Sequence, residues 1–242
     1  MRIFTIITIF YACLYHYSYG QSVGASSLAK EIAAYPIGYY KKATEISQNL
    51  YNGRQYYMYD ARAEEHQFFN ERKWRKGVVR YDGQQFDSVA MMYDILKDEL
   101  VIKHFNGDHI LLQSEKVDFF WLEQHNFQRL ESGKDVNEQM RTGFYDILYN
   151  GKTRTIMRRT KQRQEKIVDK SVIPQFPPKD FFYILKDGRY HSVHTKKSVF
   201  ALFPKHKKEL RRVLREPKIR FRKNREVAIT RIAARYDELA KP

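Results

Sequence analysis

The chain has 242 residues and a single cysteine, Cys13, so no intramolecular disulfide can hold it together and an apolar core must supply its stability. After residue 20, no stretch approaches the length of about 18 apolar residues that a membrane-spanning helix needs. The formal net charge of +16 is unevenly placed, because residues 141–242 contain 28 Lys and Arg against 10 Asp and Glu. Such an excess is either a solvated surface or an attraction for an anionic partner.

Residues 1–20 have the three parts of a secretory signal peptide. Arg2 supplies a positive charge, residues 3–15 form an apolar core, and Ser18 and Gly20 are small residues before the expected cleavage point. The core is too short to cross a bilayer of about 30 Å. We therefore expect cleavage between Gly20 and Gln21, followed by export to the periplasm, the outer membrane or the medium. No transmembrane segment is expected to remain.

Two alternatives for this N-terminus are less favoured. A lipoprotein would be acylated at Cys13, but residues 10–12 (Phe-Tyr-Ala) are a poor approach to an acylation site, and cleavage there would cut the apolar core in half. A buried strand or helix rarely begins a folded domain with so uninterrupted an apolar run. The ordinary signal peptide remains the preferred interpretation.

Residues 21–50 are predicted to be helical, with Pro36 as a break. The apolar residues at helix-like spacings are Leu28, Ile32, Tyr39, Ala43, Ile46 and Leu50. Ser27 and Lys30 form a Ser-x-x-Lys pair, which in penicillin-binding enzymes supplies a nucleophile and its base. The companion motifs Ser-x-Asn and Lys-Thr-Gly are missing downstream, so we interpret this pair as a chance match.

Short runs rich in aromatic and β-branched residues follow, and each predicts a strand. They cover residues 74–81, 89–95, 100–105, 110–112, 117–122, 144–149 and 153–157. In the second run Val89, Met91, Tyr93 and Ile95 alternate with other residues. Because alternate residues of a strand share a face, this face is predicted to be buried.

Four Asn-Gly or Asp-Gly pairs separate the predicted strands: Asp82-Gly83, Asn106-Gly107, Asn150-Gly151 and Asp187-Gly188. Such pairs favour tight hairpin turns, so they indicate an antiparallel meander. Eight to eleven strands are expected, in a curved sheet, a sandwich or an incomplete barrel. Gly151-Lys152-Thr153 also matches the end of a nucleotide-binding P-loop. However, Asp146 occupies the position of the first P-loop glycine, so a hairpin is preferred.

The C-terminal part is predicted to contain one more hairpin and three helices. Residues 167–180 contain three prolines and little pattern, which is typical of a linker. A hairpin at 181–194 and helices at 198–203, 204–215 and 224–240 follow. On the last helix an apolar stripe lies opposite Arg231, Arg235 and Glu238, and its members are Ala228, Ile229, Ile232, Ala233, Tyr236, Leu239 and Ala240.

The expected fold class is therefore α+β, mainly antiparallel β, with a meander followed by a small unit of hairpin and helices. The predicted divisions are a signal peptide (1–20), a helical segment (21–50), a β-rich domain (51–166), a Pro-rich linker (167–180) and a basic unit of hairpin and helices (181–242).

Several phrases of the sequence occur together in a recognisable order. They are "LYNGRQYYMYD", "HQFF", "WRKGVVRYDGQQFDSVAMMYDILKDELV", "GFYDILYNGK", "YILKDGRYHSV" and "LFPKHKKELRRVLREPKIRFRKNRE". Together they resemble a family of uncharacterised exported proteins of Gram-negative bacteria, in which a β-rich segment precedes a short basic helical tail. The resemblance covers most of the chain after the signal peptide. It implies export and the fold, and it brings no catalytic or ligand-binding residues with it.

The strongest candidate site is the basic tract of residues 205–225, which holds 11 Lys and Arg against 2 acidic residues. The cations proposed to contact an anionic partner are Lys207, Lys208, Arg211, Arg212, Arg215, Arg220 and Arg222. In an exported protein the partner would be an anionic lipid or an acidic polysaccharide of the cell envelope. The alternative is a solvated face that keeps the protein soluble. Nucleic acid would suit such a tract inside a cell, but export argues against it.

Histidines and carboxylates offer weaker candidates. His191 and His194 are three apart, so on a strand they point to opposite faces, while His104, His109 and His125 lack an acidic or thiol ligand at a recognisable spacing. Metal binding is therefore not predicted, and no cofactor is expected.

Three acidic residues, Asp94, Asp98 and Glu99, flank a strand end and could pair as in a glycosidase. Carboxylates beside a turn are common for conformational reasons, and the sequence offers no separation to measure. We therefore expect a non-enzymatic binding or structural component of the envelope, with a hydrolase as a weaker alternative.

The aromatic residues of the sheet could form a contact surface for an apolar ligand or partner. The residues concerned are Tyr81, Tyr93, Phe119, Phe120 and Trp121. Aromatic side chains at such positions more commonly form plain core.

Overall fold

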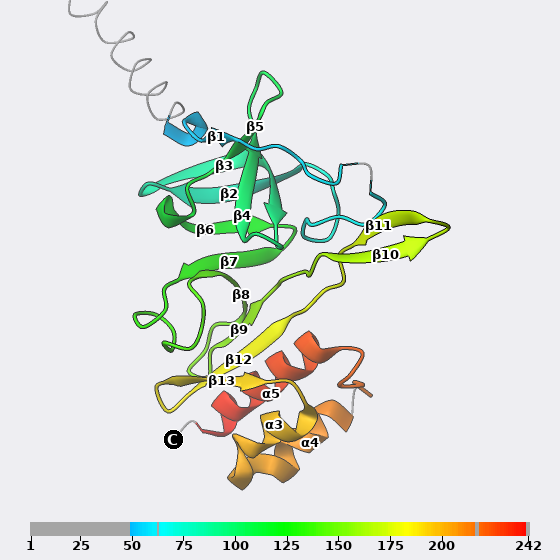
Figure 1. Cartoon of the computed structure of the whole chain (residues 1–242). Coiled ribbons are helices and arrows are strands. Elements are labelled where there is room, and N and C mark those ends of the chain that lie inside the picture. Colours follow the sequence, from blue (N-terminus) through cyan, green and yellow to red (C-terminus); the bar gives the residue numbers. More distant parts are fainter. Residues whose placement is uncertain (1–48, 62, 216–217, 241–242) are drawn as a thin grey trace, which may run out of the picture. The chain divides into compact units, whose positions relative to one another are not determined.

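The computed structural model describes residues 49–61, 63–215 and 218–240. The predicted signal peptide, with Cys13 and the Gly20-Gln21 cleavage point, lies outside the described residues, as does the Ser27-x-x-Lys30 pair. From Leu50 onward the chain has an α+β fold that consists mainly of antiparallel strands (Figure 1). Among the described residues, no helix has the length and apolar character needed to cross a bilayer.

Eleven of the described strands form one large, curved and unclosed sheet in the order β1-β5-β4-β3-β2-β6-β7-β8-β9-β12-β13. In chain order they are β1 (Arg54–Gln55), β2 (Arg75–Tyr81), β3 (Gln84–Asp94), β4 (Glu99–Lys103), β5 (His109–Leu111), β6 (Val117–Leu122), β7 (His125–Leu130), β8 (Gly143–Tyr149), β9 (Thr155–Arg158), β12 (Phe181–Lys186) and β13 (Arg189–Val193). Neighbours pair antiparallel throughout. The predicted meander is thus confirmed.

The segment expected to be a linker instead contributes to a hairpin. Strands β10 (Gln164–Val168) and β11 (Ser171–Gln175) pair with each other, with Ile167 opposite Val172. Pro174 lies in β11 opposite Glu165, which is tolerated because a two-stranded hairpin has only edge strands. This corrects the expectation for residues 167–180. The two segments expected as separate units also share one sheet, because β12 pairs directly with β9.

Two of the four predicted turns have the expected geometry. Asp82 and Gly83 have φ values of 51° and 76°, and Asp187 and Gly188 have 51° and 75°, so both residues of each pair are left-handed as a type I′ turn requires. In the β4–β5 connection only Gly107 has a positive φ. The β8–β9 connection is a longer loop without positive φ at Asn150 or Gly151.

Gly151 is nevertheless needed in its loop because of close contacts. A Cβ atom there would lie 2.3 Å from the Tyr149 hydroxyl and 2.5 Å from an Asp237 carboxylate oxygen. Asp237 accepts hydrogen bonds from the backbone N–H of Thr153 at 2.9 Å and from the Tyr149 hydroxyl at 3.1 Å. This loop is therefore held to the C-terminal helix and does not form a phosphate-binding cradle.

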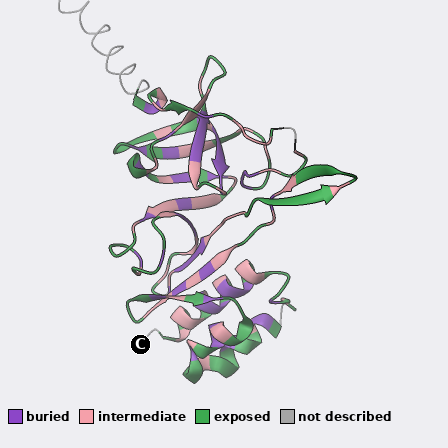
Figure 2. Cartoon of the chain, in the orientation of Figure 1, coloured by how far each residue is buried: buried purple, intermediate pink, exposed green. Residues whose placement is uncertain are grey.

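An aromatic core packs on one face of the sheet. The rings of Phe120 and Phe127 stack at 4.8 Å, and Tyr93 contacts both at 5.1 and 4.9 Å. Phe144 completes the group, with its ring 5.1 Å from Phe120. The predicted buried stripe of β3 lies in this core, which confirms the alternation seen in the sequence. Figure 2 shows buried segments along these strands, whereas the β10–β11 hairpin is largely exposed.

The aromatic contact surface considered above is not present as a single face. Tyr81, Tyr93 and Phe120 are buried in the core, whereas Trp121 is 46% exposed. Phe119 and Trp121 alternate with Phe120 on β6, so they point to the opposite side of the strand. A surface made of all five side chains is therefore excluded by the strand geometry.

The N-terminal segment of residues 56–61 and 63–69, here called the strap, covers the outer face of β3 and β4. Tyr56 and Phe68 pack against Met92 and Val101. Asp94 at the end of β3 is fully buried and accepts hydrogen bonds from the hydroxyls of Tyr56 and Tyr59, each at 2.8 Å. The strap therefore gives β3 a second buried face.

Asp98, in the β3–β4 turn, connects that end of the sheet to β8 and β9. Its carboxylate accepts hydrogen bonds from the Tyr93 hydroxyl at 2.5 Å and from the Phe144 backbone N–H at 3.3 Å. It also pairs with the Arg158 guanidinium at 3.2 Å. A Cβ on Gly143 would lie 1.9 Å from this carboxylate, so the glycine permits the approach.

The stability contributed by Asp98 is expected to depend on pH. Burial raises the pKa of Asp98 above its ordinary value of 3.8. Protonation is then easier in the folded chain, so this contribution is fully present below the unfolded pKa and is lost as the pH rises through the folded pKa. Urea unfolding from acid to neutral pH should therefore show the wild-type free energy of unfolding falling relative to that of Asp98→Asn. Parallel pH profiles for the two proteins would contradict this.

The C-terminal helices pack on the sheet face formed by Met157, Phe182 and Ile184. They are α3 (Lys196–Ala201), the 3₁₀ turn η2 (Pro204–His206), α4 (Lys207–Arg215) and α5 (Arg225–Leu239). The apolar stripe predicted for the last helix is confirmed at Ala228, Ile229, Ile232 and Ala233, which are all fully buried. Its last predicted member, Ala240, is exposed and lies beyond the end of the helix. Arg231, Arg235 and Glu238 are exposed on its other side.

Candidate anion-binding cleft

The start of α3 is set by a capping box. The Thr195 hydroxyl accepts a hydrogen bond from the Ser198 backbone N–H at 3.1 Å, and the Ser198 hydroxyl accepts one from the Thr195 N–H at 3.1 Å. Lys196 and Lys197 therefore occupy the first turn of the helix, where no acidic residue accompanies them. Cations at a helix N-terminus oppose the helix dipole, so this arrangement is electrostatically unfavourable without an anion.

The rotation of α4 is set by its buried leucines. Leu210 and Leu214 are 0% and 3% exposed and pack in the core beneath the helices. This orientation brings Lys207, Arg211 and Arg215, which are spaced four residues apart, to one side of the helix. Lys208 and Arg212 occupy the adjacent stripe.

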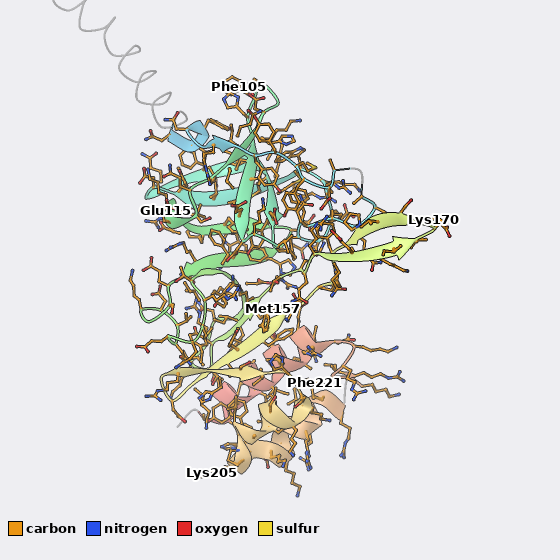
Figure 3. All side chains as sticks on the ribbon, viewed as in Figure 1. Phe105, Glu115, Met157, Lys170, Lys205 and Phe221 are labelled. Carbon is orange, nitrogen blue, oxygen red and sulfur yellow. The ribbon has the colours of Figure 1, made fainter. Side chains whose placement is uncertain are left out.

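Two adjoining hollows, here called the basic cleft, lie along α3, α4 and the segment after α4. Their volumes are about 730 and 700 Å³, and they share Lys196, Lys197 and Ile219 in their walls. The cations that line the basic cleft are Lys196, Lys197, Lys207, Arg211, Arg215, Lys218, Arg220, Arg222, Lys223 and Arg225. Among the described lining residues none is acidic. Figure 3 shows nitrogen-tipped side chains extending from this helical part near Phe221.

Aromatic rings position several of these cations. The ring of Phe200, which is 4% exposed, has the Lys196 ammonium 5.8 Å and the Arg211 guanidinium 5.9 Å from its centroid. Arg225 lies 5.6 Å from the centroid of Phe182. Such contacts stabilise a cation at a ring face by about 0.5–1 kcal/mol at exposed sites. They hold the charged groups without neutralising them.

The cations of the basic cleft have no ion-pair partners within the described part of the chain. None of its ten cations forms an ion pair with an acidic side chain in residues 49–61, 63–215 or 218–240. Like charges that share a low-dielectric wall raise the local potential and concentrate counter-ions. The arrangement can therefore hold phosphate or carboxylate groups.

The structure divides the residues proposed from sequence into two sets. Lys207, Arg211, Arg215, Arg220 and Arg222 line the basic cleft, whereas Lys208 and Arg212 do not. Sequence reasoning missed Lys196, Lys197, Lys218, Lys223 and Arg225, of which the first two come from a different helix. Lys218, Lys223 and Arg225 lie within the basic tract of residues 205–225, whereas the signal for Lys196 and Lys197 was the absence of acidic residues between Asp187 and Glu209.

The histidines considered as metal ligands have unrelated surroundings. His104 hydrogen-bonds with the Asn106 side chain at 2.6 Å, His109 packs against Trp74, and His125 contacts Asp146 at 2.8 Å. His194 lines the basic cleft, and His191 lies on β13 opposite Ile184. Within the described ranges, no three His, Cys, Asp or Glu side chains come together in a way that could hold a metal ion.

The carboxylates considered as a glycosidase pair belong to separate hydrogen-bond networks. Asp94 binds the strap and accepts hydrogen bonds from the backbone N–H groups of Leu96 and Lys97 at 3.0 and 3.1 Å. Asp98 binds β8 and β9 as described above. Burial raises the pKa of Glu99, which lies at the first position of β4.

Comparisons of this chain with protein-family models, with curated proteins and with solved structures find no match.

Proposed function

We propose that the chain is an exported, non-enzymatic protein of the cell envelope that binds anionic envelope lipids or polysaccharides through the basic cleft. The observation that carries this proposal is the gathering of ten cations from separate segments around two adjoining hollows, without an acidic residue among the described lining. The sequence supports the location, since residues 1–20 have the pattern of a signal peptide.

Phosphate and carboxylate groups suit the basic cleft because five of its lining cations are arginines, which bind such groups in a bidentate manner. The two hollows are not enclosed, and together they run along α3, α4 and the segment after α4. This shape suits an extended surface or a polymer better than a small enclosed ligand. The apolar floor is formed by Phe200, Leu214 and Phe221, each less than 10% exposed, so the accessible groups are mainly the cations.

Replacing three of the cations that line the basic cleft should abolish most of the binding to anionic vesicles or heparin. Each cation near an anionic surface contributes about 1 kcal/mol, so the variant Lys207→Gln, Arg211→Gln, Arg215→Gln should bind anionic vesicles or heparin about 100-fold more weakly at low salt. Wild-type binding should also weaken steeply with added salt, because the Debye length falls from about 10 Å at 0.1 M to about 3 Å at 1 M. Vesicle sedimentation and heparin chromatography measure both effects.

The same segment supplies a matched control. The variant Lys205→Gln, Lys208→Gln, Arg212→Gln removes the same amount of charge from exposed positions outside the basic cleft. We expect it to lose binding only several-fold. Equal losses in the two variants would show that net charge, rather than the basic cleft, drives binding. Salt-independent binding would also contradict the proposal.

Fractionation of the native cells tests the proposed location. We expect the chain in the envelope or periplasmic fraction, with Gln21 as its first residue by mass spectrometry of the intact protein, because cleavage is expected after Gly20. An uncleaved chain in the cytosolic fraction would refute export. Nucleic acid would then become the anionic partner to examine first.

A further inference from the structure

A third hollow, of about 540 Å³, lies apart from the basic cleft. Its walls come from the β3–β4 turn, from the segment before β8, from β9 and the residues after it, and from β12. On β12, Phe181 and Tyr183 line this hollow. The alternate residues Phe182 and Ile184 pack against the helices. Alternate residues of a strand point to opposite faces, so this hollow opens on the sheet face away from the helices.

Two cations in this hollow are held in place by internal bonds. The Lys161 ammonium donates hydrogen bonds to the backbone carbonyls of His66 at 2.6 Å and Phe68 at 2.8 Å. An ammonium has three N–H donors, so one remains for a ligand. The Arg158 guanidinium, with its side chain 16% exposed, is held by Asp98. Groups that are already ordered lose little side-chain entropy when a ligand binds.

The hydration that the Lys161 ammonium loses on burial is only partly replaced by contacts within the protein. Burial lowers the pKa of the Lys161 ammonium, and neither its carbonyl partners nor the nearby carboxylates of Glu65, Asp94 and Asp180 fully offset this loss of hydration. An anion in the hollow would offset this desolvation and so would bind the ammonium favourably. Among the described lining residues Asp98 alone is acidic, and it already accepts hydrogen bonds from the Tyr93 hydroxyl, the Phe144 N–H and Arg158.

One wall of this hollow is aromatic. Phe181 on β12 pairs directly with Arg158 on β9, so a ring and a guanidinium lie side by side on the same sheet face. Tyr183, two residues along the strand, extends this wall, and both rings are partly exposed to the hollow. Burial raises the pKa of the Tyr183 hydroxyl, which therefore remains a hydrogen-bond donor at neutral pH.

We infer that this hollow is a binding site for a small organic anion that carries a ring. Its carboxylate or phosphate faces Lys161 and Arg158, and its ring lies against Phe181 and Tyr183. A volume of about 540 Å³ falls within the range of 300–1,000 Å³ that is typical of small-molecule sites. The exposed rim cations Lys97, Arg141 and Lys179 attract such an anion to the opening.

Ligand-observed NMR titration of the full chain with benzoate and with glucuronate tests this inference. Both compounds carry one carboxylate on a six-membered ring, and we expect Kd values in the millimolar range or below. Glucose has a ring without charge, and inorganic phosphate has charge without a ring, so each should bind at least about tenfold more weakly. The inference is overturned if phosphate binds as tightly as benzoate and glucuronate. It is also overturned if neither benzoate nor glucuronate binds.

Variants locate the site. Lys161→Gln should weaken benzoate binding about tenfold, since a charge-assisted hydrogen bond is lost. Because Lys161 also holds the strap, Lys97→Gln with Lys179→Gln serves as a second variant at exposed positions, and it should weaken binding several-fold. Unchanged binding in both variants overturns the assignment.

A cleft variant separates this inference from the proposed function. Lys207→Gln, Arg211→Gln, Arg215→Gln removes charge from the basic cleft and leaves the third hollow intact. It should bind benzoate as wild type does, even though its retention on anionic vesicles is lost. Loss of benzoate binding in this variant would place the small anion in the basic cleft and overturn the inference.

Discussion

Replacing Arg159 by methionine is expected to lower the free energy of unfolding by about 3–5 kcal/mol, because it leaves a buried carboxylate without its main counter-charge. Asp146, whose side chain is 2% exposed, accepts a hydrogen bond from the Arg159 Nε at 2.7 Å. The same guanidinium donates two further bonds to Glu226 on α5, at 3.0 and 2.9 Å. One side chain thus connects β8 to the C-terminal helix. Urea denaturation of the two proteins measures the difference.

Two further variants test the physical reason. Glu226, with its side chain 40% exposed, should tolerate replacement by glutamine at a cost of about 1 kcal/mol or less, because water can compensate for the lost charge. The double variant Asp146→Asn, Arg159→Met should be less destabilised than the sum of the single variants, because it no longer buries an unpaired charge. Additive effects would show that Arg159 acts through packing alone.

Replacing Asp94 by alanine is expected to cost a similar amount, about 3–5 kcal/mol. Hydrogen bonds to a charged group contribute about 1.5–3 kcal/mol each, and donors left unpaired in the interior add a desolvation penalty. Asp94 is fully buried and accepts four hydrogen bonds, two from tyrosine hydroxyls of the strap and two from backbone N–H groups of the β3–β4 turn. Thermal and urea unfolding of the variant measure the loss.

The strap provides a local readout for the same variant. Without Asp94 the hydroxyls of Tyr56 and Tyr59 lose their shared acceptor, so the strap should become more sensitive to limited proteolysis under native conditions. Tyr59→Phe is the matched control, since it removes one donor and leaves the carboxylate with three, and it should cost about 1–1.5 kcal/mol. Unchanged proteolysis in Asp94→Ala would show that other contacts hold the strap.

Most strands could be predicted because their signals are local. The alternation in β3 and the Asp-Gly pairs at residues 82–83 and 187–188 depend only on near neighbours in the chain. Strand β7 was missed because polar residues interrupt its apolar pattern, with the half-buried Asn126 and Gln128 beside the buried Phe127. Strand β11 was missed because proline normally argues against a strand, whereas an edge position tolerates it.

The position of β12 illustrates what sequence cannot provide. Residues 159–180 separate β9 from β12, yet the two strands pair directly, with Phe181 opposite Arg158. This pairing depends on contacts far apart in the chain, and no local pattern encodes them. It is also the contact that forms the aromatic wall of the third hollow.

The sequence by itself determined that the C-terminal part is strongly basic, that its last helix has one apolar face, and that short antiparallel strands precede it. These properties follow from composition and short-range periodicity, which a linear chain displays directly. Only the tertiary structure decided which cations share a cleft. The burial of Leu210 and Leu214 sets the rotation of α4, and the packing of α3 beside it adds Lys196 and Lys197 while leaving Lys208 and Arg212 outside. The charge of each side chain can be read from the sequence, whereas a binding site depends on which side chains the tertiary structure turns toward one another.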